Sequence, residues 1–310
     1  MTPWQPTAPL SNLRHRAQLL REVRAFFHER QVLEVDTPLL MPNSVTDPYM
    51  TALEVHNLGQ TYYLQTSPEY AMKRLLCAGI GDIYQLGKNV RAEERGAKHQ
   101  SEFTLLEWYR VGWDHHQLMD EVFALVSMAT GLSKRENYTY QQCFEQYLAF
   151  DPLAITTPQL AAIASEKLGQ LPADLRHDDY LSLLFATCIE PFLGQGGVAF
   201  VSDFPASQAS LARLNPEHQT AARFECYCSG LELANGFWEL TEATLQQQRF
   251  EADNLTRQTL GKPTIAIDEP FLAALEHGLP MCSGVALGFD RLLMLSLGES
   301  DIARVVPFAQ

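Results

Sequence analysis

The chain has 310 residues, of which 46% are hydrophobic, enough for one large domain or two small ones with a sizeable core. Its formal net charge of −14 does not attract a polyanion such as tRNA, although a local basic patch can still exist. An acidic surface suits a basic protein partner better, so we expect no nucleic-acid partner. No apolar run reaches membrane-spanning length and residues 1–10 lack a secretory pattern, so we also expect no membrane and a cytoplasmic location.

The cysteines favour a reducing compartment over a metal site. Of the six, only Cys226 and Cys228 are close in sequence, and no second pair accompanies them. Structural zinc sites usually take their ligands from two such pairs. We therefore expect buried, reduced thiols.

The first predicted elements are a helix and a short strand. Residues 1–10 form a loose arm, and an apolar stripe then predicts a helix to about residue 30, with Ser11 or Asn12 as its cap. A strand over 32–37 follows and is stopped by a proline.

A second strand and a hairpin come next. Residues 61–66 are strand-like, and Ser67 and Pro68 then have the pattern of a helix start. The strands of the hairpin are predicted over 82–90 and 103–113, with a basic loop between them.

The rest of the chain mixes helices with further strands. Strands joined mainly by hairpins, with helices grouped elsewhere, favour an α+β antiparallel sheet over βαβ winding. The chain has no Walker loop and no Rossmann glycine pattern, so a nucleotide would be bound by another device. The predicted elements are helices over 114–130, 241–260 and from 288 onward, a mostly helical segment over 135–195, and strands over 198–203, 224–230, 231–237 and 284–287.

The hairpin carries the first candidate site. Because strand side chains alternate between faces, Phe103, Glu107 and Tyr109 share one face of the second strand, and Arg91 and Glu93 share one face of the first. An aromatic ring, two carboxylates, a phenol and a guanidinium then point into one space. This suits a nucleotide and a small cationic molecule, although an amphipathic hairpin with a solvated face has the same pattern.

A second candidate site contains two carboxylates, Glu232 and Glu239, on either side of an Asn235-Gly236 bend. Carboxylates that face phosphates need a divalent cation between them, and Mg²⁺ takes one or two carboxylates plus phosphate oxygens. An ordinary hairpin turn explains the same residues, since Asn-Gly is a strong turn signal.

A third candidate is Arg291, which follows a glycine turn and lies in the first turn of a predicted helix. A cation there opposes the helix dipole, so the position favours an arginine that binds an anion or stacks on a ring. The alternative is a surface arginine paired with Asp290.

The three candidates together resemble one family. Arg91–Phe103, Glu232–Glu239 and Gly288–Arg291 occur in the order and spacing of class II aminoacyl-tRNA synthetase catalytic domains, and the first helix and the strand ending at Pro38 resemble that family's dimer-interface motif. The resemblance extends from about residue 11 to 308. It implies an antiparallel sheet flanked by helices, and a homodimer.

The resemblance also implies a domain organisation. Residues 1–310 are expected to form a single class II catalytic domain, with a loose arm over 1–10 and the helical segment 135–195 as an insertion. Within the class, the stretches 66–70, 103–109 and 232–237 are most similar to lysyl-tRNA synthetases.

Two departures from lysyl-tRNA synthetases change the expected acceptor and substrate. Only residues 1–10 precede the first helix, so we expect no anticodon-binding domain. Ala286 stands where those synthetases have glycine, and Ser67 where they usually have a small apolar residue. In the missing domain and in Ala286 the chain is similar to the truncated paralogues that attach a lysine-type amino acid to elongation factor P, and Ser67 is expected to add a hydrogen bond to the displaced amine. One extra methyl in a pocket can discriminate by ~1–3 kcal/mol, here against an α-amino group, although plain packing also explains an alanine.

The resemblance therefore implies an ATP-dependent, AMP-forming ligase. It would adenylate (R)-β-lysine, and α-lysine less well, and transfer it to a lysine ε-amine of elongation factor P. A minimal lysyl-tRNA synthetase-like enzyme acting on tRNA and a non-catalytic regulatory binder stay open as alternatives. The implied residues are Arg91, Glu93, His99, Phe103, Asn235 and Arg291 for ATP, with Arg91 and Arg291 catalytic; Ser67, Glu69, Glu107, Tyr109, Glu239 and Ala286 for the amino acid; and Glu232 and Glu239 for Mg²⁺.

Overall fold

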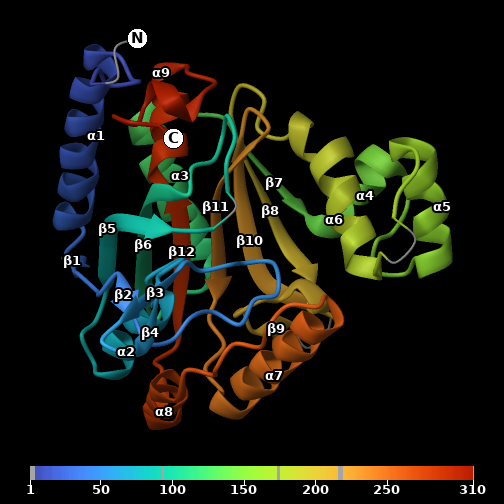
Figure 1. Cartoon of the computed structure of the whole chain (residues 1–310). Coiled ribbons are helices and arrows are strands. Elements are labelled where there is room, and N and C mark those ends of the chain that lie inside the picture. The colour runs from blue at the N-terminus through green and yellow to red at the C-terminus, as the bar shows by residue number, and fades with distance from the viewer. Residues whose placement is uncertain (1–3, 93, 173–174, 216–218, 310) are drawn as a thin grey trace. The chain divides into compact units, whose positions relative to one another are not determined.

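The computed structural model describes residues 4–92, 94–172, 175–215 and 219–309, and Figure 1 shows its helices and strands. The chain divides into two compact units, which are described separately here. Unit 1 comprises residues 1–114 and 239–310, and unit 2 comprises residues 115–238.

Unit 1 is built on a sheet with the strand order β1-β5-β6-β12, in which β1 pairs with β5 in parallel and the other neighbours are antiparallel. A separate antiparallel sheet has the order β2-β4-β3. The elements are α1 (Leu10–Glu29), β1 (Leu33–Glu34), β2 (Leu40–Met41), β3 (Glu54–Asn57), β4 (Gln60–Leu64), α2 (Glu69–Cys77), β5 (Ile83–Val90), β6 (Glu102–Val111), α7 (Ala243–Thr259), α8 (Glu269–Gly278), β12 (Cys282–Gly288), α9 (Phe289–Leu297) and the 3₁₀ helix η3 (Ile302–Arg304).

One face of the larger sheet in unit 1 is its aromatic core. Tyr84 of β5 pairs with Trp108 of β6, which pairs with Val285 of β12, so the three side chains share a face. Phe27 of α1 stacks on Tyr84 with ring centroids 4.4 Å apart and meets Trp108 edge-on at 5.3 Å. Helix α1 therefore covers this face, and the alternate residues of β6 are left for the opposite one.

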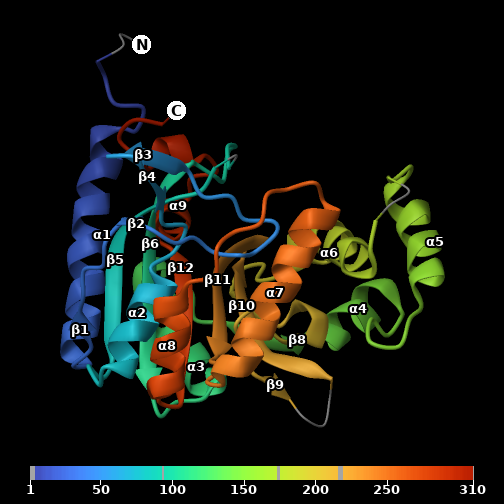
Figure 2. The same cartoon turned by 60° about the horizontal axis from the view of Figure 1, so that its bottom comes forward.

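Helix α2 is held by stacking against its neighbour α8. Tyr70 of α2 stacks on Phe271 of α8 with centroids 4.6 Å apart, and Phe250 of α7 lies 5.6 Å from Tyr70. Figure 2 shows α2 and α8 side by side. Side chains in the first turns of α2 are thereby placed on a rigid support.

The start of α9 is fixed by the buried Asp290. Arg16 of α1 donates to its Oδ1 at 2.5 Å, and the backbone N–H of Thr104 donates to its Oδ2 at 2.7 Å. Arg16 also donates to the Thr104 hydroxyl at 2.7 Å. Asp290 thus ties α1, β6 and α9 together, and its bonds to Arg16 and the Thr104 N–H do not support the alternative of a surface arginine paired with Asp290.

The predicted cap of α1 is also wrong. Pro9 stands at the N-cap without a side-chain hydrogen bond. Asn12 is buried instead, and its amide donates to Glu299 Oε1 at 2.9 Å and to the carbonyl of Arg304 at 3.0 Å. Asn12 therefore hydrogen-bonds to the C-terminal segment and does not cap the helix, the role that local sequence alone predicted.

Unit 2 contains a sheet with the order β11-β10-β8-β7, in which β7 and β8 are parallel and β9 pairs with β10. Its core lies between this sheet and the helices, around buried aromatic residues such as Tyr140, Phe144 and Phe185. The elements are α3 (His115–Thr130), β7 (Arg135–Thr139), α4 (Tyr140–Leu148), α5 (Thr157–Leu168), α6 (His177–Cys188), η1 (Glu190–Phe192), β8 (Val198–Pro205), η2 (Ala206–Gln208), β9 (Leu214–Asn215), β10 (Thr220–Cys228) and β11 (Leu231–Trp238).

The turn between β10 and β11 lies before the Asn235-Gly236 pair, which is the strongest turn signal in the sequence of this hairpin. Ser229 and Gly230, with φ of 52° and 67°, form the turn. Asn235 and Gly236 pair with Glu225 and Phe224 inside the ladder, so the predicted Asn-Gly bend is wrong. A two-residue turn needs positive φ at both positions, and Ser229-Gly230 meets that need while β11 continues through the Asn-Gly pair.

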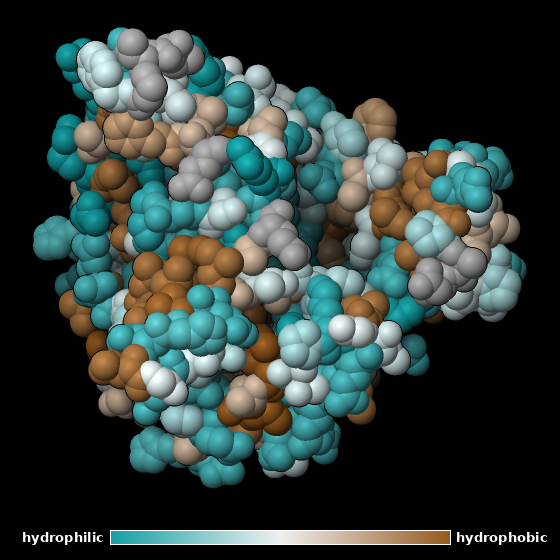
Figure 3. Space-filling model, in the orientation of Figure 1, coloured by the Kyte–Doolittle hydropathy of each residue, from teal (hydrophilic) through white to brown (hydrophobic). Residues whose placement is uncertain are grey.

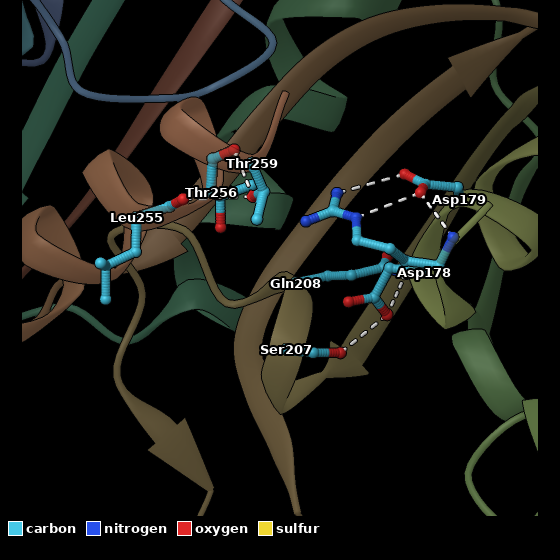
Figure 4. Close-up of polar contacts among 8 residues, drawn as sticks. Asp178, Asp179, Ser207, Gln208, Leu255, Thr256 and Thr259 are labelled. Carbon is cyan, nitrogen blue, oxygen red and sulfur yellow. Dashed lines mark hydrogen bonds and ion pairs between the residues drawn. The ribbon is translucent and has the colours of Figure 1, made fainter. Parts of the chain in front are cut away.

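Polar contacts close the helix ends drawn in Figure 4. In unit 2, Asp178 at the start of α6 accepts from Ser207 at 2.8 Å, and Asp179 accepts from the backbone N–H of Arg176 at 2.9 Å. In unit 1, the Thr259 hydroxyl donates to the carbonyls of Leu255 and Thr256 in the last turn of α7. The bond from the Arg176 N–H to Asp179 pairs a backbone donor at the start of α6 that the helix itself leaves unpaired.

The state of the cysteines agrees with the prediction of buried, reduced thiols. All six cysteines are free thiols, and Cys188 alone of them is not fully buried. Among the described residues, no helix is both long and apolar enough to span a bilayer. Figure 3 shows a mostly hydrophilic face with hydrophobic patches, and the large side chains exposed near the small sheet include Leu40, Leu53 and Leu58.

Replacing Asp290 with alanine is expected to destabilise the fold by about 3–5 kcal/mol, because Arg16 loses its buried partner and the Thr104 N–H its acceptor. Urea unfolding measures the change. Glu102→Ala is the control, since it removes an exposed ion pair between Glu102 of β6 and Lys88 of β5 and should cost about 0–1 kcal/mol. Equal losses in the two variants would contradict the role of Asp290.

Candidate functional site

The second face of the sheet in unit 1 carries the candidate site. Glu107 of β6 lies between Gln85 of β5 and Ala286 of β12 in the ladder. One row further along, Tyr109 is paired with Gly284. Paired residues point to the same side of a sheet, so the methyl of Ala286 stands beside Glu107, as the alternation in the sequence predicts.

Glu107 has its two oxygens bound by two other predicted residues. The Ser67 hydroxyl donates to Oε2 at 2.8 Å, and the Tyr109 hydroxyl donates to Oε1 at 2.7 Å. Ser67 also accepts from the backbone N–H of Glu69 at 3.1 Å, at the start of α2. Only 1% of Glu107 is exposed, and this burial, together with the charge of Glu69, raises its pKa to about 8.

Lys73, which the sequence analysis did not select, lies at the centre of this cluster. It follows Glu69 by one turn of α2, and its Nζ is 2.7 Å from Glu69 Oε1 and 2.6 Å from Glu239 Oε2. Its side chain is 1% exposed. Burial lowers the pKa of this amine, but the two carboxylates outweigh burial and raise it above its usual value, so Lys73 stays charged.

Glu239 follows β11 directly and is fully enclosed. Its carboxylate faces Lys73 and accepts from the backbone N–H of Gly284. Burial raises the pKa of Glu239, and the Lys73 ammonium opposes that rise. A side chain at position 284 would overlap both the Tyr109 ring and the Glu239 carboxylate, which is why this strand has glycine there. Ser67, Glu69, Glu107, Tyr109 and Glu239 are therefore brought together.

A second cluster in unit 1 contains the predicted cationic residues. Arg91 follows β5; its Nε donates to the carbonyl of Thr66 at 3.2 Å, and its guanidinium lies 5.0 Å from the centre of the Phe103 ring. It also has a long ion pair with Glu94, at 3.5 Å. The arrangement combines a flat aromatic ring with a cation, which suits a nucleobase and a phosphate.

Arg291 contacts the loop between β5 and β6. Its guanidinium meets His99 Nε2 and donates to the carbonyl of Lys98 at 3.4 Å. Burial, and then the charge of Arg291, lower the pKa of His99, so its imidazole is neutral at pH 7 and can accept from the guanidinium.

Three predicted residues are not placed with these clusters. Glu93 lies outside the described residues. Asn235 and Glu232 belong to unit 2, where Asn235 Oδ1 accepts from Arg223 Nε at 3.1 Å and Glu232 is partly exposed on β11.

The residues predicted for Mg²⁺ are chemically suited to it. Lys73 and the Gly284 N–H occupy part of the Glu239 carboxylate, which offers about four lone-pair positions in all. The described residues contain no group of three or more His, Cys, Asp or Glu side chains arranged to hold a metal. Magnesium bound by one or two carboxylates and phosphate oxygens needs no such group, and its assignment to Glu232 and Glu239 stays a prediction.

The Gly284→Ala variant should lose about 1–3 kcal/mol of stability, because its methyl overlaps Tyr109 and Glu239. The Gly87→Ala variant on β5 is the matched control. Its methyl meets Gln85 Nε2 at an ordinary 3.5 Å, so stability should hold or rise by about 0.4–1 kcal/mol. Chemical denaturation compares the two, and a Gly284→Ala protein as stable as the control would show that the packing around Gly284 is not tight.

The raised pKa of Glu107 predicts a pH dependence of stability. The folded protein holds a proton on this carboxyl up to about pH 8, while the unfolded chain releases it near 4.5. Between these values the folded state binds more protons, so its contribution to stability falls as pH rises, by at most about 1.4 kcal/mol per pH unit. Glu107→Gln removes this contribution. Identical pH slopes for wild type and variant between pH 5 and 8 would refute the shift.

Comparisons with known proteins agree with this geometry. Residues 6–310 match the family model described as tRNA synthetases class II (D, K and N). The chain is 48% identical to the elongation factor P–(R)-β-lysine ligases of Hamiltonella defensa subsp. Acyrthosiphon pisum and of Vibrio cholerae serotype O1, in each case over 98% of this chain and 97% of the relative. It is also 48% identical to the ligase of that name from Edwardsiella ictaluri, over 100% of this chain and 98% of the relative.

The predicted fold class, an α+β arrangement of mostly antiparallel sheets flanked by helices, is confirmed by the two units and by the family match. With a family model matching nearly the whole chain and near-full-length relatives at 48% identity, this chain belongs to the class II tRNA synthetase family of the D, K and N group.

Proposed function

We propose that this protein is an ATP-dependent ligase that activates (R)-β-lysine, and α-lysine less well, and transfers it to a lysine ε-amine of elongation factor P. The observation that carries the proposal is the acidic cluster of Glu69, Glu107 and Glu239, of which the last two are buried, in a chain whose relatives are ligases of that name.

The acidic pocket suits the ammonium groups of a diamino acid. A buried cation is stable only where opposite charge and hydrogen bonds replace its water. Glu107 and Tyr109 supply a carboxylate and a phenol at one place, and Glu69 and Glu239 supply two further carboxylates. A monoamino acid would leave part of this negative charge uncompensated.

The second cluster suits ATP, which class II synthetases use. Adenine would stack on Phe103, with Arg291 on its other face and Glu93 at its edge, and His99 would approach the γ-phosphate. Asn235 would orient the substrate or the phosphate end. Stacking of a guanidinium over an aromatic or a base is a favourable use of arginine. The support is the proximity of Arg91 to Phe103 and the contact between Arg291 and His99.

The first reaction step would form an aminoacyl-adenylate from the amino acid and ATP. A carboxylate oxygen of the amino acid attacks the α-phosphorus, a new P–O bond forms, and the bond to pyrophosphate breaks. Arg91 would stabilise charge on the α-phosphate, Arg291 would hold the adenine in position, and no protein nucleophile is needed. Magnesium, held by Glu232 and Glu239 when bound, would supply charge neutralisation at the phosphates.

The second step would transfer the acyl group to a protein. The ε-amine of the acceptor lysine attacks the acyl carbon, an amide bond forms, and the bond to AMP breaks. The net charge of −14 favours a protein acceptor over tRNA. A homodimer and a cytoplasmic location accompany this proposal as predictions from the family resemblance and the composition.

The preference for β-lysine would come from the pocket wall. Ala286 lies beside Glu107 in the ladder, so its methyl occupies space near the bound ammonium. It would crowd an amino group on the α-carbon and tolerate one on the β-carbon. Ser67, which donates to Glu107, would also bond to the displaced amine.

Pyrophosphate exchange tests the function. Exchange should depend on (R)-β-lysine more than on α-lysine, and the activated amino acid should pass to elongation factor P and not to tRNA. Exchange that prefers α-lysine, together with charging of tRNA, would favour the tRNA-directed alternative. No exchange with any amino acid would favour a regulatory binder.

The Ala286→Gly variant tests the source of selectivity. Removing the methyl should improve kcat/KM for α-lysine relative to β-lysine by about 10–200-fold, as expected for one methylene-sized group in a pocket. The KM for ATP in the same variant is the internal control and should not change. An unaltered ratio between the two amino acids would mean that Ala286 only packs the strand.

A further inference from the structure

We infer that Lys73 is a positioning residue that shapes the amino-acid pocket: its ammonium holds Glu69 and Glu239 in place. When a bound cation ionises all three carboxyls, Lys73 leaves the pocket with two negative charges, the number that a diamino acid neutralises. The inference rests on the proposed function, because it concerns the same pocket and the same ligand class.

The contacts of Lys73 support a fixed position. Its Nζ bridges Glu69 Oε1 at 2.7 Å and Glu239 Oε2 at 2.6 Å, and its side chain is 1% exposed. Glu69 lies one turn earlier on the same helix, whereas Glu239 comes from the segment after β11. One buried ammonium therefore sets the separation of two carboxylates from different parts of the chain.

The ligand-facing charges come from three segments. Glu69 is on α2, Glu107 on β6, and Glu239 follows β11; with Lys73 included, their ionised forms sum to −2. The strongest charged neighbours of Glu107 and Glu239 are Glu69 and Lys73 themselves. Lysine and β-lysine each bring two ammonium groups, whose positive charge equals the negative charge that these side chains carry when ionised.

Without Lys73 the same pocket would hold three carboxylates and no fixed cation. Glu69 and Glu239 would repel each other, and the ligand's ammonium groups would have to replace both Lys73 contacts as well as make their own. A buried ion pair that loses one partner leaves an uncompensated charge. The effect on the ligand should therefore appear in its binding.

The test compares Lys73→Met with Lys73→Arg in the full chain. The methionine variant should raise the KM and the Kd for (R)-β-lysine about tenfold or more, because uniform binding of the amino acid is lost. The Kd, measured without ATP and Mg²⁺, reports this loss separately from any effect on the nucleotide. The arginine variant keeps the charge and should recover most of that loss. Pyrophosphate exchange gives KM and kcat, and calorimetric titration gives the Kd.

The double variant Lys73→Met with Glu69→Gln covers the case in which Lys73→Met fails to fold. It removes one of the two carboxylates that lose their partner and restores the summed charge of −2. Its loss of affinity for (R)-β-lysine should therefore be smaller than the product of the fold-losses in the two single variants. Thermal unfolding of each variant separates loss of fold from loss of binding.

The outcomes distinguish the inference from the function. Wild-type protein that binds no diamino acid would overturn both. Wild-type protein that binds (R)-β-lysine, with folded Lys73→Met or double variants that bind it equally well, would overturn the role of Lys73 alone. A Lys73→Arg protein as impaired as Lys73→Met would also overturn it, since charge would then not be what matters.

Discussion

The burial of two carboxylates, Glu107 and Glu239, next to a third, Glu69, is the constraint on which the site depends. Glu107 and Glu239 are each 1% exposed, and a carboxylate removed from water is stable only when hydrogen bonds or opposite charge replace its hydration. The chain meets this need in two ways. Ser67 and Tyr109 hydrogen-bond to both oxygens of Glu107, whereas the Lys73 ammonium serves Glu69 and Glu239. These contacts replace only part of the lost hydration, so the pKa of Glu107 stays raised. A cationic ligand would supply the opposite charge that Glu107 still lacks.

The second cluster depends on a different buried charge. Asp290 bonds to Arg16 and to the Thr104 N–H, and this fixes the first turn of α9 against α1 and β6. Arg291, the next residue, is then directed to the loop that carries His99. Asp290 and Arg291 are therefore adjacent in sequence but contact different parts of the structure: Asp290 contacts α1 and β6, and Arg291 contacts the loop with His99. The stability of the fold and the placement of the nucleotide cluster therefore depend on the same helix start.

The sequence predicted the parts of this site that follow from local periodicity. The two-residue alternation of β6 placed Glu107 and Tyr109 on one face, and the register with Ala286 agrees with that pattern. Residues whose position is set by tertiary contacts were missed or misassigned. Asn12 had the features of a cap and instead bonds to the C-terminal segment, and Asn235-Gly236 had the features of a turn inside what is a continuous strand. The pairing of Lys73 with Glu69 could have been predicted, since the two residues are four positions apart on the predicted helix and therefore lie on the same face. The second partner of Lys73, Glu239, lies far away in sequence and could not be inferred from spacing.

The central claim is that the pocket is built for a ligand with two ammonium groups. Calorimetric titration of the protein with (R)-β-lysine and with 3-aminohexanoic acid, which has the same chain without the terminal amine, tests it most directly. We predict measurable binding of (R)-β-lysine and an affinity for the monoamine that is lower by about a hundredfold or more, as expected when buried charges are left unpaired. Equal affinity for the two compounds would contradict the account.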